Sequence, residues 1–353
     1  MINKILIPTI AFIIFIIFII LSFKKSYKSN NMQFDINKEG SIELKGIAIM
    51  CVIIGHLCMW GFIKIPFVSF LGAQGVELFL FISGYGLTKS YIRNGIDRTY
   101  FIKRIKKVFM PYFIVTIIII LVNIWVIGAK LSIRTIFLWL IGLNIKFDGS
   151  MWYISFIMFW YIVFFIIFKP NMNNKIRIVI LFFISSLMFY FSQKSSKGDL
   201  NNEYISHCFM FPIGCFWSIY SDRIFKKINN KITTNNIILF MKVTSFICLF
   251  IIFPISYKLI NVTVFYLLCN LSFTIAIIMI ILIYKYYNCS SKFLEFVGKI
   301  AFEIYLIEGI FMYKYSVLKL INVKIISIIL FLLFVIIIAS LLNKIFKYVL
   351  KFQ

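Results

Sequence analysis

Long apolar stretches alternate with short polar loops along almost the whole chain. A helix needs about 20 residues to cross the hydrocarbon core of a bilayer. The pattern therefore predicts an all-α polytopic membrane protein with about ten to eleven transmembrane helices. The predicted spans cover residues 5–21, 44–62, 70–88, 109–129, 151–168, 176–192, 206–220, 237–254, 264–284, 296–313 and 323–343.

Composition agrees with this pattern. Of the 353 residues, 62% are hydrophobic, and the mean hydropathy is +0.99. An ordinary soluble domain is nearer half apolar. Because the spans and their short loops use up the chain, no room remains for a separate soluble domain. We expect an extra N-terminal transmembrane helix within residues 1–23 and one membrane-embedded domain of ten spans over residues 24–353.

The net charge of +25 comes from lysines and arginines that gather in alternate loops. This is the positive-inside pattern, so the charge indicates topology and contact with anionic lipid of the bilayer, and nucleic acid is not expected as a partner. The loops assigned to the cytoplasm carry more than twice the basic residues of the outer loops. The pattern predicts a multi-pass protein of the cell membrane with a cytoplasmic C-terminus and an outside N-terminus. The segment 131–143 is too short to span and is expected along the outer interface.

One polar pair interrupts the second apolar stretch, which reads Glu43-Leu-Lys-Gly-Ile-Ala-Ile-Met-Cys-Val-Ile-Ile-Gly-His56. Lys45 and His56 are about three helical turns apart, so they share one helix face about 16 Å apart along the axis. An ionisable group is costly inside a bilayer, so His56 is a candidate site residue. A ligand with an anionic head and a reactive tail fits between the two.

Two carboxylates are predicted at the depth of His56. Glu77 lies in the next span and Glu308 in the tenth, and both fall in the outer half of the bilayer at 1.5 Å per residue. A histidine near carboxylates is a candidate general base, because the carboxylate fixes its tautomer and stabilises the imidazolium. The alternative is a structural cluster whose hydrogen bonds only hold helices together. The residues alone leave both open.

A basic cluster lies ahead of the fourth span, where Lys103, Arg104, Lys106 and Lys107 precede Pro111. Basic side chains beside a helix N-terminus make an anion site. Arg104 is the best candidate, because a guanidinium group forks onto phosphate. The alternative is a topology anchor that binds nothing.

Further candidates are weaker. In Ser83-Gly-Tyr85 the glycine allows a close approach of backbone to a ligand or to another helix. Trp152 and Tyr153 fit an aromatic belt, with a sugar-stacking platform as the second interpretation. His207 is expected near the outer surface, where a histidine is comfortable in water, and we do not place it among the site residues.

Several chemistries have no support. The seven cysteines form no C-x-x-C pair and no metal-ligand spacing, so no metal is expected and the cysteines indicate apolar filling. No Walker A loop and no G-x-S-x-G elbow occurs, which leaves ATP-driven transport and serine hydrolysis without a motif.

The motifs taken in order resemble the acyltransferase-3 family of integral membrane acyltransferases. The hallmark of that family is a basic residue, ten residues and a histidine, here Lys45 and His56. The other similar segments are GAQGVELFLFISGYGL (72–87), FIKRIKKVFMPYF (101–113), MWYISFIMFWY (151–161) and VGKIAFEIYLIEG (297–309). The similarity covers most of residues 41–310. Lys45 stands where the family usually has arginine, its acidic residue is displaced to Glu43, and Glu308 stands where histidine is common.

The resemblance implies an acyl-CoA donor, with acetyl as the expected group, and a hydroxyl of a cell-surface or lipid-linked glycan as acceptor. It implies helices around an acyl-CoA pore and assigns three groups of residues. These are Lys45, Arg104, Lys106, Ser83 and Tyr85 for the donor, His56 and Glu77 for catalysis, and Trp152, Tyr153 and Glu308 for the substrate side. No oligomeric state is predicted.

Two mechanisms and two competing functions stay open. His56 acts as general base on the acceptor hydroxyl or carries the acyl group transiently, and Glu77 orients or charge-stabilises it. The competing function is a transporter or flippase for a lipid-linked sugar that uses His56 and Glu77 as a proton relay. An inactive relative that only binds a partner is a third interpretation.

Overall fold

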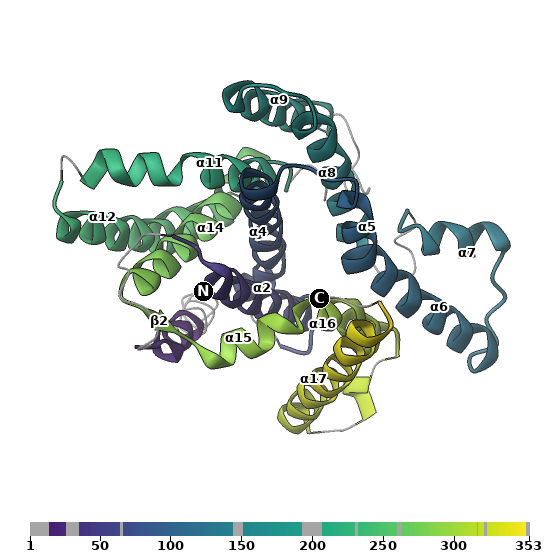
Figure 1. The fold of residues 1–353 in the computed structure, drawn as a ribbon. Helices are drawn as coiled ribbons and strands as arrows, with labels where there is room; N and C mark the ends of the chain where they lie inside the picture. The colour runs from purple at the N-terminus through teal and green to yellow at the C-terminus, as the bar shows by residue number, and fades with distance from the viewer. Residues whose placement is uncertain are drawn as a thin grey trace. The chain divides into compact units, whose positions relative to one another are not determined.

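The computed structural model describes residues 14–25, 35–63, 66–143, 151–192, 207–229, 232–259, 263–315, 317–320 and 323–350. Its contacts divide the chain into two compact units, each of them mainly helical (Figure 1). Unit 1 comprises Met1–Arg93 and Asn173–Lys299, and unit 2 comprises Asn94–Met172 and Ile300–Gln353. The N-terminal segment belongs to unit 1. The division into an extra N-terminal helix and one membrane-embedded domain over residues 24–353 stays a prediction.

Unit 1 contains most of the long helices and the two short strands. Asn37 caps the helix that carries Lys45 and His56, because Gly40 N donates a 2.7 Å hydrogen bond to Asn37 Oδ1 and so satisfies a backbone donor at the helix start. Residues 14–22 are helical. The remaining elements are β1 (Lys24–Lys25), α2 (Lys38–Met59), α3 (Pro66–Ser69), α4 (Leu71–Asn94), α9 (Asn174–Ser192), α11 (Met210–Asn229), α12 (Thr234–Ile247), η3 (Cys248–Ile252), α13 (Phe253–Lys258), α14 (Thr263–Tyr286), β2 (Cys289–Ser290) and α15 (Lys292–Lys299).

Unit 2 contains one helix of 26 residues near its C-terminal end, several shorter helices and two π-helical turns. Ser132 caps the short helix α7, which exposes Ile133 and Phe137. The interfacial position of 131–143 stays a prediction. Pro111 lies inside the continuous helical run Tyr100–Trp125, directly after the π-helical turn that precedes α6. The elements are α5 (Tyr100–Arg104), η1 (Ile105–Phe109), α6 (Met110–Trp125), α7 (Ile133–Leu140), α8 (Trp152–Phe168), α16 (Ala301–Gly309), η4 (Ile310–Lys314), η5 (Val317–Leu320) and α17 (Lys324–Val349).

Glycines let the helices of unit 1 approach closely. A Cβ built on Gly55 of α2 would lie 2.2 Å from the backbone nitrogen of Gly72 in α4. A Cβ on Gly84 of α4 would lie 2.2 Å from the carbonyl oxygen of Phe211 in α11. Small residues at such crossings are typical of helix packing in membranes. Similar contacts occur at Gly46, Gly75, Gly214 and Gly298.

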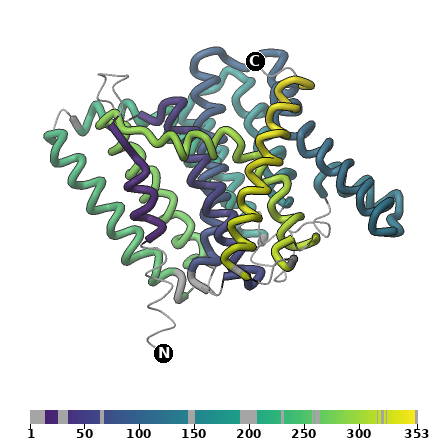
Figure 2. The backbone as a smooth tube through the Cα atoms, turned by 90° about the horizontal axis from the view of Figure 1, so that it is seen from below, coloured from purple at the N-terminus to yellow at the C-terminus, as the bar shows by residue number. Residues whose placement is uncertain are grey.

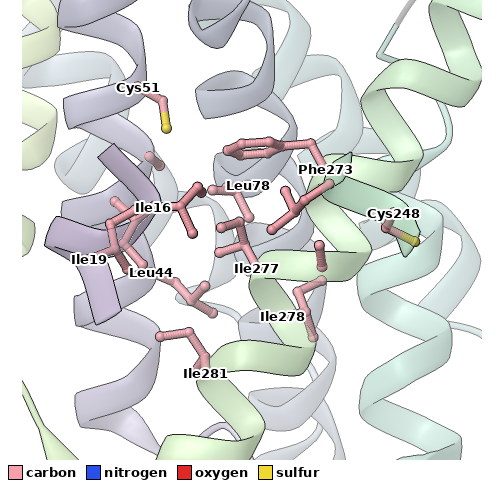
Figure 3. Packing of buried hydrophobic residues seen from close by; sticks show 14 of the residues in the cluster. Ile16, Ile19, Leu44, Cys51, Leu78, Cys248, Phe273, Ile277, Ile278 and Ile281 are labelled. Carbon is pink, nitrogen blue, oxygen red and sulfur yellow. The ribbon is translucent and has the colours of Figure 1, made fainter. Parts of the chain in front are cut away.

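The N-terminal segment is part of the core of unit 1. Ile16 and Ile19 belong to the same buried cluster as Leu44, Leu78 and Ile277 (Figure 3). The backbone of the segment lies beside that of α14 (Figure 2). The ring of Phe23 stacks on Tyr284 at 4.3 Å, and the Tyr284 hydroxyl donates to Ile20 O. Residues 1–13, which hold much of the predicted first span, lie outside the described residues.

Six helices in the described part of the chain are long and apolar enough to cross a membrane, judged by length and composition. They are Lys38–Met59, Tyr100–Trp125, Asn174–Phe191, Thr234–Ser256, Val264–Tyr286 and Ile325–Val349. These match six of the predicted spans. The predicted spans 70–88 and 206–220 form the helices α4 and α11, which are not among the six, and α8 is a shorter apolar helix.

The prediction of one span over 296–313 is wrong. The chain forms α15 up to Lys299 and starts α16 at Ala301. The close approach of Gly298 to the backbone of Ile42 and the ion pair of Lys299 with Glu295 keep α15 at the surface of α2, so it cannot continue as a membrane-crossing helix.

Candidate active site

The helix α2 carries the pair that the sequence singled out. It is unbroken from Lys38 to Met59, so Lys45 and His56 lie on one helix as predicted. The side chain of Lys45 is exposed, while that of His56 is half-buried. The imidazole of His56 lies 5.0 Å from the ring of Trp60, one turn further on. The pair therefore joins an accessible cation to a partly sheltered imidazole.

His56 lies where α2 crosses α4. A Cβ built on Gly72 would lie 3.7 Å from Gly55 Cα and 3.8 Å from His56 Cδ2. Gly75, one turn later, faces the backbone of Ala48. The side of α4 that carries Gly72 and Gly75 is therefore the side that packs against α2 and the His56 ring.

Glu77 is paired with the other histidine of the chain. Its Oε1 lies 2.6 Å from Nδ1 of His207, and both side chains are about 1% exposed. The expectation that His207 sits in water near the surface is wrong. The turn that precedes α11 folds inward and buries the ring beside Tyr266, at 6.4 Å between centroids.

The Glu77–His207 pair occupies the opposite side of α4 from His56. Each helical residue turns the chain by about 100°, so Glu77 shares a side with Gly84, which packs on α11. Gly72 and Gly75 fall on the other side. The expected contact of Glu77 with His56 is thus replaced by a contact with His207, because sequence spacing fixed the depth of Glu77 but not the neighbour that its side faces.

A second polar pair supports this cluster. Gln74 Nε2 donates a 2.7 Å hydrogen bond to Asn270 Oδ1, and both side chains are fully buried. Asn270 also stands beside the Glu77 carboxylate. The cluster therefore ties α4 to α14 and to the residue that leads into α11. Hydrogen bonds between helices are the ordinary way to bury such groups in a membrane.

Glu43, the displaced acidic residue of the first motif, has a separate role. Its Oε2 lies 2.5 Å from Lys285 Nζ, and its Oε1 accepts a 2.8 Å hydrogen bond from Ser291 N. Both charged side chains are buried. The pair fastens α2 to the end of α14 and to the start of α15, two residues away from Lys45.

The Ser-Gly-Tyr motif is only partly open. Ser83 is half-buried. Tyr85 is 3% exposed, and its hydroxyl donates to Asp35 Oδ1 at 2.7 Å and to Ile36 O at 3.0 Å. Lys89 also binds Asp35, at 3.0 Å. The described contacts of Tyr85 therefore hold the segment before α2 against α4.

The basic cluster of unit 2 divides into different environments. Arg104 Cζ lies 5.6 Å from the ring centroid of Tyr100 and 5.8 Å from that of Tyr161. Its Nε is buried, with no hydrogen-bond acceptor among the described residues. Aromatic faces attract a guanidinium group without using its hydrogen-bond donors. Lys106 is exposed in the π-helical turn η1. Anion binding by Arg104 and Lys106 stays a prediction.

Lys103 has a protein partner. Its Nζ lies 2.7 Å from Asp97 Oδ2, and Thr99 Oγ1 donates to the same oxygen. The hydrogen bond from Lys103, followed by that from Thr99, holds the pKa of Asp97 below its ordinary value. Because Lys103 already pairs with a carboxylate on an exposed loop, this ion pair favours the interpretation of Lys103 as a topology anchor that binds no anion.

The residues expected on the substrate side all belong to unit 2. Trp152 and Tyr153 are each 7% exposed, and the Tyr153 ring packs edge-on against Tyr305 at 5.6 Å. Tyr305 lies three residues before Glu308, which is fully buried. Tyr153 and α16 are thus neighbours within unit 2. Glu308 belongs to unit 2 and His56 to unit 1. The equal depth of the two side chains in the membrane therefore stays a prediction.

Metal ligands do not gather in the described part of the chain, where no group of three His, Cys, Asp or Glu side chains is close enough to hold an ion. All seven cysteines are free thiols, five of them buried.

The long apolar helices define a multi-pass membrane protein. A family model described as an acyltransferase domain matches residues 40–344, which is most of the chain, so the protein belongs to the acyltransferase-3 family of membrane acyltransferases. This confirms the resemblance carried by the five sequence motifs. No curated protein and no solved structure matches the chain.

Proposed function

We propose that the protein moves an acyl group from acyl-CoA to a hydroxyl of a cell-surface or lipid-linked glycan, with acetyl as the expected group. Membership of the acyltransferase-3 family supports acyl transfer as such. The observation that carries the finer proposal is the unbroken helix α2, which presents Lys45 and His56 on one side about 16 Å apart. That spacing suits a donor with an anionic head and a thioester at the end of an extended arm.

In the proposed reaction, His56 takes the proton of the acceptor hydroxyl while the hydroxyl oxygen attacks the thioester carbonyl. The carbon–sulfur bond breaks, the acyl group stays on the acceptor oxygen, and CoA leaves as the thiol with the proton that His56 held. In the two-step variant, His56 first takes the acyl group from CoA and then gives it to the acceptor. Accessibility favours His56 over His207 in both, because His56 is half-buried while His207 is 1% exposed.

Three cations are proposed to bind the phosphates of the donor. Lys45 is exposed, Arg104 is held between two aromatic rings, and Lys106 is exposed in η1. The half-buried Ser83 is proposed to contact the donor arm. Tyr85 is assigned a supporting role, since its hydroxyl already binds Asp35 and Ile36.

Glu77 and His207 are proposed as a positioning pair. They fix the rotation of α4 about its axis by holding one side of it to the start of α11. The opposite side, with Gly72, then meets the His56 ring. On the acceptor side, Trp152, Tyr153 and Glu308 are proposed to contact the glycan.

The test uses the full chain in lipid nanodiscs with acetyl-CoA and a panel of glycans. Acceptor-dependent release of free CoA is expected, and His56→Ala is expected to abolish it. Met59→Ala, an exposed position on the same helix, is the control that keeps the activity. Release of CoA that is unchanged in His56→Ala overturns the proposed role. Mass spectrometry of surface glycans from cells with and without the gene then identifies the acceptor.

The transporter interpretation makes the opposite prediction, which is proton flux without CoA release. It requires His56 and Glu77 to exchange a proton. The described contact of Glu77 is with His207, on the other side of α4 from the His56 ring, so this geometry favours the enzyme.

A further inference from the structure

The helix α15 and the strand β1 build an exposed surface that combines aromatic and basic side chains. We call it the α15 surface, and it consists of Lys24, Lys25, Lys292, Phe293 and Phe296. Phe293 is 46% exposed and Phe296 is 49% exposed. The opposite side of α15 is buried. A helix with one apolar side packed on protein and with aromatic and basic residues on the other is typical of a membrane interface.

The place of α15 in the chain agrees with an interfacial position. Five residues separate it from the end of the candidate membrane span Val264–Tyr286, so it lies where the chain leaves the membrane. It lies across the first turns of α2, where Gly46 meets Leu294 O and Gly298 meets Ile42 O. These backbone contacts hold α15 flat against α2. Its exposed side therefore has a fixed orientation.

The charged side chains that make up the α15 surface are all lysines and therefore positive. In the β1–β2 pair, Lys24 lies opposite Ser290 and Lys25 opposite Cys289, which brings both exposed lysines to the start of α15 near Lys292. The carboxylate of α15, Glu295, is already paired with Lys299 at 2.6 Å.

Aromatic contacts extend the same surface to the N-terminal segment. The Phe18 ring meets Phe293 edge-on at 5.7 Å and is itself 45% exposed. The surface thus includes residues that precede the family match, which begins at residue 40.

We propose that the α15 surface binds the headgroups of anionic phospholipids, with Phe293 and Phe296 inserted just below them. Lysines near a membrane surface attract anionic lipid, and aromatic rings are favourable at the headgroup level. The three lysines supply the charge complementarity and the two rings supply the apolar insertion. The proposal does not rest on acyl transfer.

The first test counts phospholipids that stay bound to the purified full chain in native mass spectrometry. Each lysine near an anionic surface contributes about fivefold in affinity. The triple variant Lys24→Gln, Lys25→Gln and Lys292→Gln is therefore expected to lose on the order of a hundredfold in phosphatidylglycerol affinity, with phosphatidylcholine binding unchanged. The matched control removes three exposed charges elsewhere in unit 1, with Arg223→Gln, Lys226→Gln and Lys227→Gln. No loss, or an equal loss in both triple variants, overturns the proposal.

The second test locates the aromatic side chains. Phe296→Trp is a mild change at an exposed position, and its added fluorescence is read against the unmodified protein in nanodiscs of brominated lipid. Quenching is expected to be strongest when bromine lies near the glycerol end of the acyl chain, and stronger with phosphatidylglycerol than with phosphatidylcholine. Absence of quenching, or strongest quenching from bromine near the chain end, contradicts an interfacial position.

Discussion

Among the described residues of unit 1, two carboxylates are buried, and their partners differ in kind. Glu43 is paired with Lys285 at 2.5 Å, and Glu77 with His207 at 2.6 Å. Both carboxylates are at most 1% exposed, and each partner comes from a segment far away in the sequence. The Glu43–Lys285 pair joins a carboxylate to an ammonium group, and we call it the fixed clamp. The Glu77–His207 pair joins a carboxylate to an imidazole ring.

Both carboxylates are buried and both are paired, so neither burial nor pairing identifies a catalytic site. Glu43 also binds Ser291 N, which completes its hydrogen bonding and leaves it as a fastener between α2 and α15. Glu77 stands among the amide side chains of Gln74 and Asn270, on the helix that also packs against the His56 ring. The nature of the partner and the connection to α2 distinguish the second pair.

The largest effect is expected from breaking the fixed clamp. Lys285→Met leaves the buried Glu43 carboxylate without its counter-charge, which costs about 3–5 kcal/mol when one member of a buried pair is removed. The measurement is the free energy of unfolding in a mixed-micelle titration. Adding Glu43→Gln is expected to recover most of the loss. An unchanged free energy in Lys285→Met alone contradicts the clamp.

A smaller loss is expected at the second pair. His207→Phe fills the space but removes the nitrogen that faces Glu77, and an unsatisfied buried group of this kind costs about 2–3 kcal/mol. His207→Gln keeps a donor and is expected to recover part of the stability.

The same variants test the positioning role. CoA release is expected to fall in His207→Phe and to recover in part in His207→Gln, while His56→Ala loses it altogether. Full activity in His207→Phe, together with an unchanged pH profile, shows that the pair does not act on the site.

Two neighbouring glycines test the α4 side that carries Glu77. A Cβ on Gly84 lies 2.2 Å from Phe211 O, whereas a Cβ on Gly86 meets nothing within 4 Å. Gly84→Ala forces α4 and α11 apart and is expected to destabilise by about 1–2 kcal/mol, in the range for overpacking. Gly86→Ala on the same helix is the matched control and is expected to lie within about 0.5 kcal/mol of the unmodified protein. Equal thermal midpoints for both variants contradict the close approach.

The smallest effect is expected at the exposed ion pair of Lys103 with Asp97. Because the pKa of Asp97 is held below its ordinary value, any stabilisation is present at neutral pH and is lost only as the pH falls through that lowered value. Both side chains are about half exposed, so solvent screens the pair. Asp97→Asn is expected to leave the thermal midpoint unchanged at pH 7. A clear drop in the thermal midpoint at pH 7 contradicts the expectation that this exposed pair stabilises the protein less than the buried pairs do.

The sequence predicted most of the helices, but it did not predict which helices pack against each other. The apolar run that ends at His56 predicted α2, and the structure extends it back to Lys38, because Asn37 provides a cap that hydropathy does not register. A period of 3.6 residues predicts which residues share a side of α2. It does not say which helix that side meets.

The pairing of His207 with Glu77 is the clearest example of a contact that the sequence did not predict. His207 and Glu77 are 130 residues apart, and only tertiary packing brings them together. One signal was present in the sequence, since Gly84 shares a helix side with Glu77, and Gly214 lies two turns after His207. Small residues at such positions indicate helix crossings. Two glycines do not identify each other as partners, so the pair was missed and His207 was expected in water.

The break at Ile300 has a similar cause. The apolar content of 296–313 favours a continuous span, whereas the structure ends α15 at Lys299, just after Gly298 packs on Ile42. That fit depends on α2, which is some 250 residues earlier in the sequence. The hydropathy of residues 296–313 carries no information about this contact with α2.

The packing of the N-terminal segment against α14 also sets an order of assembly during synthesis. The hydrogen bond from Tyr284 to Ile20 closes a separation of 264 residues. Chains elongate at about 5–20 residues per second, so the first helix waits roughly 15–50 seconds for its permanent neighbour to leave the ribosome. All of residues 94–172 are made in that interval. The contact between the N-terminal segment and α14 therefore cannot form until residues 94–172 of unit 2 have been made.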